Sequence, residues 1–478
     1  MKREFLFNIV LLVIINLLVK VSYLFFIEVE IQNTLGPEKY GLFLALFNFS
    51  SLLQFINDPG LQSHNSTLVA SGEKGVTSHI RYTLGLKVLL SATFVIAVMA
   101  AAYVVGYRDE EVRSLLFLIA INQVLSTGYM FLRSNLSALG FYRYDTFISA
   151  LDKLLMIAIL GYILIFHSET LTLTHFVLGQ MGAYVIACIV ALSMLMRKGI
   201  PVVPGFSISK SMDTLKGAAP FALILLLMAS YNKMDGVMLE RLIEGGAYHA
   251  GIYAASLRFM DAANMGAYLM AALLLPMFAS QHNEKGMISQ LSGLAIRLMT
   301  VYVTIICVVG INYRYDLMGI YDAYDAQYGN LLIFHLLSFG CVAISYVYGT
   351  LLTATRKLRK MNYVLILGLL INLALNLWLI PRIFAEGAAI ATLITQATVM
   401  AGQVILATSL FNLRVNVSQI IRALLFVIIA YGVVYTISQV EGVKWVYGAI
   451  ISVGMVTILS FFLGIVRKDM IFALLKQG

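Results

Sequence analysis

Charged residues are scarce in this chain of 478 residues. They make up 12% of it, whereas hydrophobic residues make up 60%, and the mean hydropathy is +0.88. Soluble domains carry about 25% charged residues, so a soluble globular protein is excluded. The apolar residues occur in runs of about 20, long enough to cross ~30 Å of hydrocarbon. A transmembrane β-barrel is excluded because its strands alternate over segments of about ten residues. The composition predicts an all-α polytopic membrane protein.

Cysteine is also rare, and the common enzyme signatures are missing. The three cysteines fall in apolar stretches, so neither a disulfide framework nor a metal site is expected. The chain has no G-x-x-x-x-G-K-[S/T] phosphate loop and no H-E-x-x-H zinc motif, and its seven histidines are scattered. Its connections are too short to house a soluble catalytic domain. We therefore expect a protein that is not an enzyme, hydrolyses no ATP and needs no cofactor.

Fourteen apolar segments follow one another along the chain. Met1-Lys2-Arg3 imitates the start of a signal peptide, but no small-residue cleavage site follows, so the first segment is expected to remain as an uncleaved span. The predicted spans are 5–27, 40–57, 82–105, 114–138, 146–166, 174–196, 218–239, 251–275, 291–312, 329–353, 361–380, 387–409, 418–438 and 444–465.

Lysine and arginine are distributed unevenly between the connections. With a cytoplasmic N-terminus, 19 lie on the inside, 7 on the outside and seven within spans. This bias follows the positive-inside rule and predicts an even number of spans with both termini cytoplasmic. It also explains the net charge of +9, so nucleic acid is not expected as a partner.

A weak internal repeat relates two parts of the chain. Residues 36–43 open the second span and residues 246–253 open the eighth, 210 residues later, each with two glycines five apart. A separation of six spans predicts two halves in the same orientation, with the substrate path between them. The predicted parts are an N-terminal lobe over 1–200, a C-terminal lobe over 217–410, and spans 13 and 14 with a cytoplasmic tail over 411–478.

Several cations lie inside predicted spans. A charge at mid-bilayer costs roughly 2.5–3.5 kcal/mol, so it normally faces a water-filled path or a partner. Lys20 and Lys233 lie about 15 residues into spans 1 and 7, roughly 22 Å from the cytoplasmic end. Two ammonium groups suit a diphosphate, and the alternative is snorkelling to the outer interface. Arg258 is a third candidate for diphosphate binding, although Asp261 three residues later favours a pair within the helix.

Neutral polar residues also recur at helical spacing within the first two spans. Such a face can hydrogen-bond sugar hydroxyls, or it can bond to neighbouring helices, which is worth only ~0.6 kcal/mol per bond on average. The sequence leaves both alternatives open. The candidate sugar-binding residues are Asn16, Asn48, Ser51, Gln54 and Asp58.

Acidic residues within spans are candidates for ion coupling. Membrane carboxylates often carry protons or Na⁺, so Asp235 and Asp261 are candidate groups for coupling to H⁺ or Na⁺. Glu240, at the end of its span, is expected to be solvated. The remaining cations lie near predicted cytoplasmic ends and are expected to snorkel to the anionic leaflet. These cations are Lys87, Arg133, Lys153 and Arg297. For Lys153 the alternative is neutralisation by the adjacent Asp152.

Several motifs of the chain resemble one family. They are Lys20, Leu35-Gly36, Tyr40-Gly41-Leu-Phe, Asp58-Pro-Gly60, Asp235 and Gly251-Ile-Tyr253-Ala-Ala-Ser. Their order and spacing resemble bacterial O-antigen (Wzx-type) flippases, within the multidrug/oligosaccharidyl-lipid/polysaccharide exporter superfamily. The resemblance covers nearly the whole chain. Pro59, inside the Asp-x-Gly turn, departs from the family pattern.

The resemblance implies a MATE-like fold, with two six-helix lobes around a central cavity that opens alternately to each side, and two extra C-terminal helices. The implied cargo is an isoprenoid diphosphate carrying a short oligosaccharide. It would be flipped to the outer leaflet of the bacterial inner membrane for O-antigen, capsule or exopolysaccharide assembly. The implied partners are this substrate, membrane lipids and a polymerase or glycosyltransferase complex.

Two rival functions follow from the same composition. A drug/cation antiporter of the same superfamily would carry acidic cavity residues and twelve spans, against the lysines and fourteen spans predicted here. A membrane polysaccharide polymerase or ligase would be expected to have a long external loop with catalytic charges. The loop 312–328 is under 20 residues long and is a poor candidate.

Overall fold

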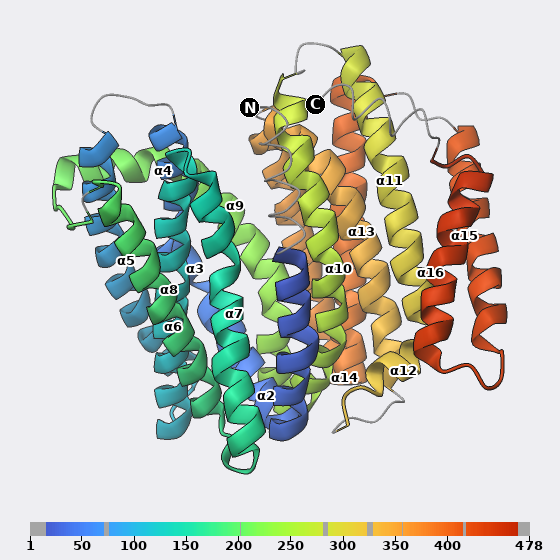
Figure 1. Ribbon diagram of the computed structural model, residues 1–478, viewed down its shortest axis with the longest axis horizontal. Helices are drawn as coiled ribbons and strands as arrows, with labels where there is room; N and C mark the ends of the chain where they lie inside the picture. The colour runs from blue at the N-terminus through green and yellow to red at the C-terminus, as the bar shows by residue number, and fades with distance from the viewer. Residues whose placement is uncertain are drawn as a thin grey trace. The chain divides into compact units, whose positions relative to one another are not determined.

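The computed structural model describes residues 16–70, 76–200, 202–280, 285–322, 328–355, 357–413 and 417–466. The first part of predicted span 1, Arg356 and the C-terminal tail lie outside the described residues. Within the described ranges all regular structure is helical, as Figure 1 shows. The predicted all-α membrane class is confirmed.

Among the described residues, ten helices are long and apolar enough to cross a membrane, or up to eleven when a bent pair near the N-terminus is counted as one span. The predicted count of fourteen therefore stays a prediction. Part of the difference comes from α14, Leu358–Phe411, which runs through predicted spans 11 and 12 as one element of 54 residues. It is broken at Ile383 and Phe384, where Phe384 has φ 51°. Such a conformation costs a bulky residue about 1–3 kcal/mol.

The chain divides into two compact units, residues 1–251 and 252–478. The three-part division at 200, 217 and 411 stays a prediction. The elements of the first unit are η1 (Tyr23–Glu28), α2 (Val29–Leu52), α3 (Gln54–Asn57), α4 (Leu61–Ala70), α5 (Val76–Val105), α6 (Glu110–Ala138), α7 (Tyr142–His167), η2 (Ser168–Thr170), α8 (Leu173–Arg197) and α9 (Ile208–Leu242). Helix α10 (Gly246–Ser280) begins in this unit and continues into the second.

The first unit is built around α2 and α6. Residues 16–22 are helical and pass directly into η1, a π-helical segment. Gly36, with φ 78°, and Pro37 break α2 between predicted spans 1 and 2. Beyond this break α2 packs against α6, α8 and α9, and α6 packs against α7 and α8. A hydrophobic cluster that includes Tyr129, Leu136 and Ala187 joins α6, α7 and α8.

The glycines of the predicted repeat lie against each other where α2 meets the start of α10. A Cβ added at Gly41 would overlap the carbonyl oxygen of Ala247, and one added at Gly251 would overlap the carbonyl oxygen of Pro37. Small residues let helix backbones approach this closely in a membrane. The two copies of the motif therefore have a shared packing role at this crossing.

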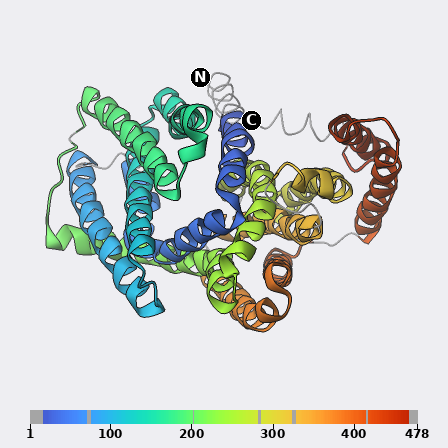
Figure 2. The same cartoon turned by 90° about the horizontal axis from the view of Figure 1, so that it is seen from below.

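The second unit contains the rest of α10, α11 (Lys285–Asn312), α12 (Arg314–Met318), α13 (Gly329–Ala354), α14, α15 (Val417–Ser438) and α16 (Trp445–Phe462). Helix α13 packs against α11 and α14. The last two helices pack against each other and against α11, and Figure 2 shows them side by side. Their contact is a hydrophobic cluster that includes Val308, Phe426, Ala430 and Val456. Most of their remaining surface is apolar and exposed, which suits contact with lipid.

The predicted topology can be tested by cysteine labelling. We expect Lys357→Cys, in a variant whose three native cysteines are replaced by alanine, to react with an impermeant maleimide only after cells are permeabilised. Asp316→Cys should react in intact cells, because it lies in a connection that the charge bias places outside. Both side chains are exposed, so access does not limit labelling. Labelling of position 357 in intact cells would contradict the fourteen-span topology.

Candidate functional site

Lys20 lies half-buried on the first helix, beside a group of charged side chains from α6 and α7. Asp152, Arg133 and Lys153 all lie within its electrostatic range. No ion pair joins Lys20 to another residue in the part of the chain that the structure describes. Its ammonium group is therefore placed among charges without being neutralised by a dedicated carboxylate.

The two neighbouring cations are paired. Arg133 Nε lies 2.5 Å from Asp145 Oδ1, and Lys153 Nζ lies 3.9 Å from Asp152 Oδ2. Lys153 Nζ also lies 4.5 Å from the ring centroid of Tyr23. The prediction that Arg133 snorkels to the membrane surface is wrong, because Asp145 within the unit holds its guanidinium. Lys153 follows the alternative in which Asp152 neutralises it, and it also lies over the aromatic face of Tyr23. Together with Lys20 the group has three cations and two carboxylates.

Lys233 belongs to a polar stretch of α9 that faces α2. Its Nζ lies 5.8 Å from the ring centroid of Phe47. Two residues later Asp235 is buried, with 1% of its surface exposed. Gly236 leaves room for Asn48, since a Cβ there would lie 2.5 Å from Asn48 Nδ2. The pairing of α2 with α9 therefore brings predicted diphosphate, ion-coupling and sugar-binding residues onto adjoining helices.

The candidate sugar-binding residues of α2 and α3 differ in whether their side chains already have hydrogen-bond partners. Ser51 donates a hydrogen bond to the Phe47 carbonyl, 2.7 Å away, and accepts one from Gln123 Nε2, 3.0 Å away. By contrast, Asn48 Oδ1 and Gln54 Oε1 are buried without a hydrogen-bond partner. A buried amide oxygen without a partner is costly, so these two residues are the better candidates for binding sugar hydroxyls.

Asn16 is also engaged. Its Nδ2 donates a hydrogen bond to Ser149 Oγ on α7, 2.6 Å away. Interhelical bonding, the alternative that the sequence left open, therefore accounts for Asn16.

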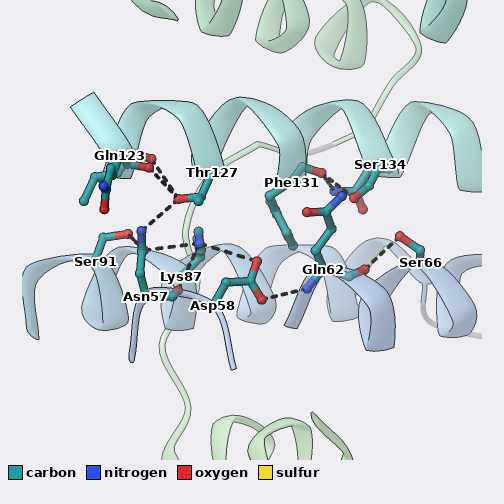
Figure 3. A network of polar contacts seen from close by, with 12 residues as sticks. Asn57, Asp58, Gln62, Ser66, Lys87, Ser91, Gln123, Thr127, Phe131 and Ser134 are labelled. Atoms are coloured by element: carbon teal, nitrogen blue, oxygen red, sulfur yellow. Dashed lines mark hydrogen bonds and ion pairs between the residues drawn. The ribbon is translucent and has the colours of Figure 1, made fainter. Parts of the chain in front are cut away.

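Asp58 follows α3 and belongs to a buried network, shown in Figure 3. Lys87 Nζ lies 3.7 Å from Asp58 Oδ2 and donates to the Asn57 carbonyl at 2.9 Å. Ser91 donates to Asn57 Oδ1, and Asn57 Nδ2 donates to Thr127 Oγ1, each at 2.9 Å. The network joins α3 to α5 and α6. Lys87 is only 3% exposed, so the prediction that it snorkels is wrong.

Removing Lys87 should destabilise the first unit. Lys87→Met leaves Asp58 buried without its cation, and breaking a buried ion pair in this way costs about 3–5 kcal/mol. We expect a lower melting temperature for the purified protein in detergent. The double variant Lys87→Met, Asp58→Asn should recover much of the loss, because it buries no unpaired charge. Equal melting temperatures for wild type and Lys87→Met would contradict a structural role for the pair.

Glu240, at the end of α9, is not merely solvated as predicted. Its carboxylate accepts a hydrogen bond from Tyr107, 2.9 Å away, and lies 2.9 Å from Arg241 Nε. The Arg241 guanidinium carbon lies 3.4 Å from the centroid of the Tyr107 ring. These contacts tie the end of α9 to the connection between α5 and α6. Nothing in the spacing along the sequence indicated this contact.

In the second unit, Arg258 and Asp261 form the pair expected within one helix. Arg258 Nη1 lies 3.1 Å from Asp261 Oδ2. The Asp261 side chain is 41% exposed, so it is not held in a buried ion-binding cage. The described residues contain no cluster of three or more His, Cys, Asp or Glu that could hold a metal ion.

Sequence comparison identifies a family for the greater part of the chain. Residues 5–282 match the sequence model of a family described as "Polysaccharide biosynthesis protein". No curated protein matches the chain significantly.

Solved structures share the fold at low sequence identity. The lipid II flippase MurJ, in an inward closed conformation, superimposes with a TM-score of 0.70 at 13% identity, covering 96% of this chain and 98% of its own. An inward-facing multidrug resistance MATE transporter gives 0.61 at 13% identity, covering 84% and 98%. A MOP-superfamily transporter from Pyrococcus furiosus gives 0.60 at 13% identity, covering 85% and 95%. The chain therefore has the fold shared by these membrane proteins.

Proposed function

Because the chain belongs to the polysaccharide biosynthesis protein family, we propose that it flips an isoprenoid-diphosphate-linked oligosaccharide from the cytoplasmic to the outer leaflet. The observation that carries this proposal is the extent of the structural match. The flippase fold covers nearly the whole chain, whereas the MATE folds leave about 15% uncovered. We attribute that difference to α15 and α16, which a twelve-helix antiporter lacks.

The charged groups of the first unit support an anionic cargo. Lys20 adds a cation to two ion pairs, and Lys233 lies on α9 beside the polar face of α2. A diphosphate is a suitable ligand because two ammonium groups can each donate several charge-assisted hydrogen bonds to it. In our proposal Lys20 and Lys233 bind the diphosphate, and the sugar passes through a wet cavity while the lipid tail stays in the bilayer. Arg258 takes part only when its pair with Asp261 opens.

The neutral part of the substrate has its own candidate residues. Asn48 and Gln54 keep buried amide oxygens without partners, and an amide both accepts and donates hydrogen bonds. They therefore suit sugar hydroxyls better than Ser51 and Asp58, whose polar atoms already have partners. Asn48 lies near the end of α2 and Gln54 at the start of α3, six residues later, which supports contact with one sugar unit or two adjacent ones.

The setting follows from the proposed activity. The protein would lie in the bacterial inner membrane with both termini cytoplasmic, delivering glycan for O-antigen, capsule or exopolysaccharide assembly. A polymerase or glycosyltransferase complex is the proposed partner. A role of Asp235 in coupling transport to H⁺ or Na⁺ is a separate proposal.

Reconstituted vesicles test the proposed function. The purified protein should expose an isoprenoid-diphosphate-linked oligosaccharide, loaded in the inner leaflet, to an impermeant lectin outside. The matched control is the same glycan on an isoprenoid without the diphosphate, which should be exposed much more slowly. If neither lipid moves and ethidium exchanges against protons instead, the antiporter is the correct function.

A further inference from the structure

A pocket of about 330 Å³ lies in the second unit, far along the chain from the lysines of the first. It is formed where the C-terminal end of α11 and the short α12 meet the connection between α15 and α16. The charge bias places these ends on the external side. Its polar lining consists of Asn312, Tyr313, Asp316, Ser438, Gln439 and Trp445.

The lining excludes two classes of ligand. It includes no lysine or arginine, so an anion has no counter-charge within the pocket. Its one carboxylate, Asp316, is also insufficient for a divalent cation, which takes six or more oxygen ligands, several of them charged. Arg314 and Lys444 are each adjacent in sequence to a lining residue, but neither belongs to the lining. The Arg314 guanidinium bonds to the Ile311 carbonyl, Asn330 and Tyr315, and Lys444 is exposed. Asp316 forms no ion pair with any residue that the structure describes.

The available atoms favour a neutral ligand with several hydroxyl groups. Asp316 supplies acceptors, and Gln439 supplies both a donor and an acceptor on a planar group. Asn312 donates to the Val308 carbonyl at 2.8 Å, and Ser438 donates to the Tyr435 carbonyl at 2.8 Å. Their oxygen atoms remain as acceptors. Trp445 adds an aromatic surface with one N–H donor, which suits a ring that has both apolar and polar faces.

Tyr313 provides a second, independent observation at the inner wall. The residue is 4% exposed, and its hydroxyl is buried without a hydrogen-bond partner. The hydroxyl rests on Gly448, where any added Cβ would overlap it. A buried polar group without a partner is destabilising. A ligand hydroxyl that reached this wall could form a hydrogen bond with the Tyr313 hydroxyl. The absence of a side chain at Gly448 leaves the space that the Tyr313 ring occupies.

We propose that this pocket is a saccharide-binding subsite for one or two sugar units of the glycan on the outer side of the membrane. Its volume lies at the lower end of ligand pockets, which hold about 300–1,000 Å³, so it suits a short part of an oligosaccharide. The identity of the sugar as transported glycan rests on the proposed function. The binding of saccharide does not require it.

Intrinsic fluorescence tests the proposal directly, because the chain has only two tryptophans, Trp378 and Trp445. Trp378 is 56% exposed, so Trp378→Phe should be tolerated and leaves Trp445 as the only reporter. The purified full-length variant is titrated with a panel of methyl glycosides and disaccharides. We expect at least one sugar to change the fluorescence saturably, and Asp316→Asn to weaken its binding at least tenfold. The matched control is Glu441→Gln, on the same connection but outside the lining, which should bind as before.

Three outcomes would overturn the subsite. They are no saturable response to any sugar, an equal response to glycerol at the same concentration, and unchanged binding by Asp316→Asn. Flipping in vesicles is measured separately with the lipid-linked substrate. If the protein binds sugar but does not flip the lipid-linked substrate, the proposed function is rejected and the subsite stands. If it flips the substrate but binds no sugar, the subsite is rejected and the proposed function stands.

Discussion

Replacing Lys20 or Lys233 by alanine is expected to reduce the export of surface glycan to background, while the protein still inserts into the membrane. Each lysine would supply charge-assisted hydrogen bonds to the diphosphate, worth about 1.5–3 kcal/mol, or roughly ten- to a hundredfold in affinity. Export is measured by lectin binding to cells, and insertion by immunoblot of the membrane fraction. Normal export by the Lys20→Ala, Lys233→Ala double variant would reject the proposed site.

Conservative variants show whether the substrate recognises the charge of Lys20 and Lys233 or only the size of their side chains. Lys20→Arg and Lys233→Arg keep the charge and should restore more export than the glutamine variants, which keep only the length and polarity. Lys39→Ala is the matched control, because Lys39 is exposed on the connection between predicted spans 1 and 2. Equal export by the arginine and glutamine variants would show that charge is not what the substrate recognises.

Membrane potential alone should accelerate flipping. Moving a net negative headgroup outward is favoured when the interior is negative, and each uncompensated charge gains ~2.3 kcal/mol per 100 mV. Two to three charges would therefore gain roughly 5–7 kcal/mol. The empty lysines, still positive, are drawn back inward by the same potential. In vesicles, a potassium-diffusion potential with a negative interior should speed flipping without any pH or Na⁺ gradient.

Asp235 is the competing explanation for the driving force. It is almost completely buried on α9, two residues from Lys233, so its protonation or its binding of Na⁺ would change the local charge. If ion coupling were obligatory, only a proton or Na⁺ gradient would drive flipping, and Asp235→Asn would abolish that response. That result would replace the potential-driven uniport with an antiport. Asp261→Asn serves as the comparison, because Asp261 is partly exposed and paired with Arg258.

The sequence was sufficient to predict the class of fold and some of the local contacts. Hydropathy predicts an all-helical membrane protein, because in lipid the backbone must be satisfied within a helix or a closed barrel, and apolar runs of about 20 residues fit only the helix. The glycines at 36, 41, 246 and 251 were visible as a repeated motif, and their packing explains why nothing larger stands at 41 and 251. The pair of Arg258 and Asp261 was predictable because i, i+3 spacing is a local property.

Pairings between distant segments were not predictable. Lys87 had the spacing of a snorkelling lysine, and its burial against Asp58 depends on how α3 turns back onto α5. Arg133 was misjudged for the same reason, since hydropathy records depth along one helix and says nothing of neighbouring helices. The pair of Lys153 with Asp152 was open to prediction because the two residues are adjacent in the sequence. No sequence pattern indicated the pocket beside Tyr313 in the second unit, because its lining residues come from two parts of the chain more than a hundred residues apart.

The contact between Gly41 and Gly251 has a consequence for mutational scanning. Any side chain at either position meets a backbone carbonyl, which cannot rotate away as a flexible side chain can. A screen that selects for glycan export should therefore return both glycines as intolerant of every substitution, although neither offers a substrate any functional group. Lys20 and Lys233 should instead tolerate arginine. The pattern of permitted substitutions, rather than the size of the loss in glycan export, would then distinguish positions needed for helix packing from positions that bind the substrate.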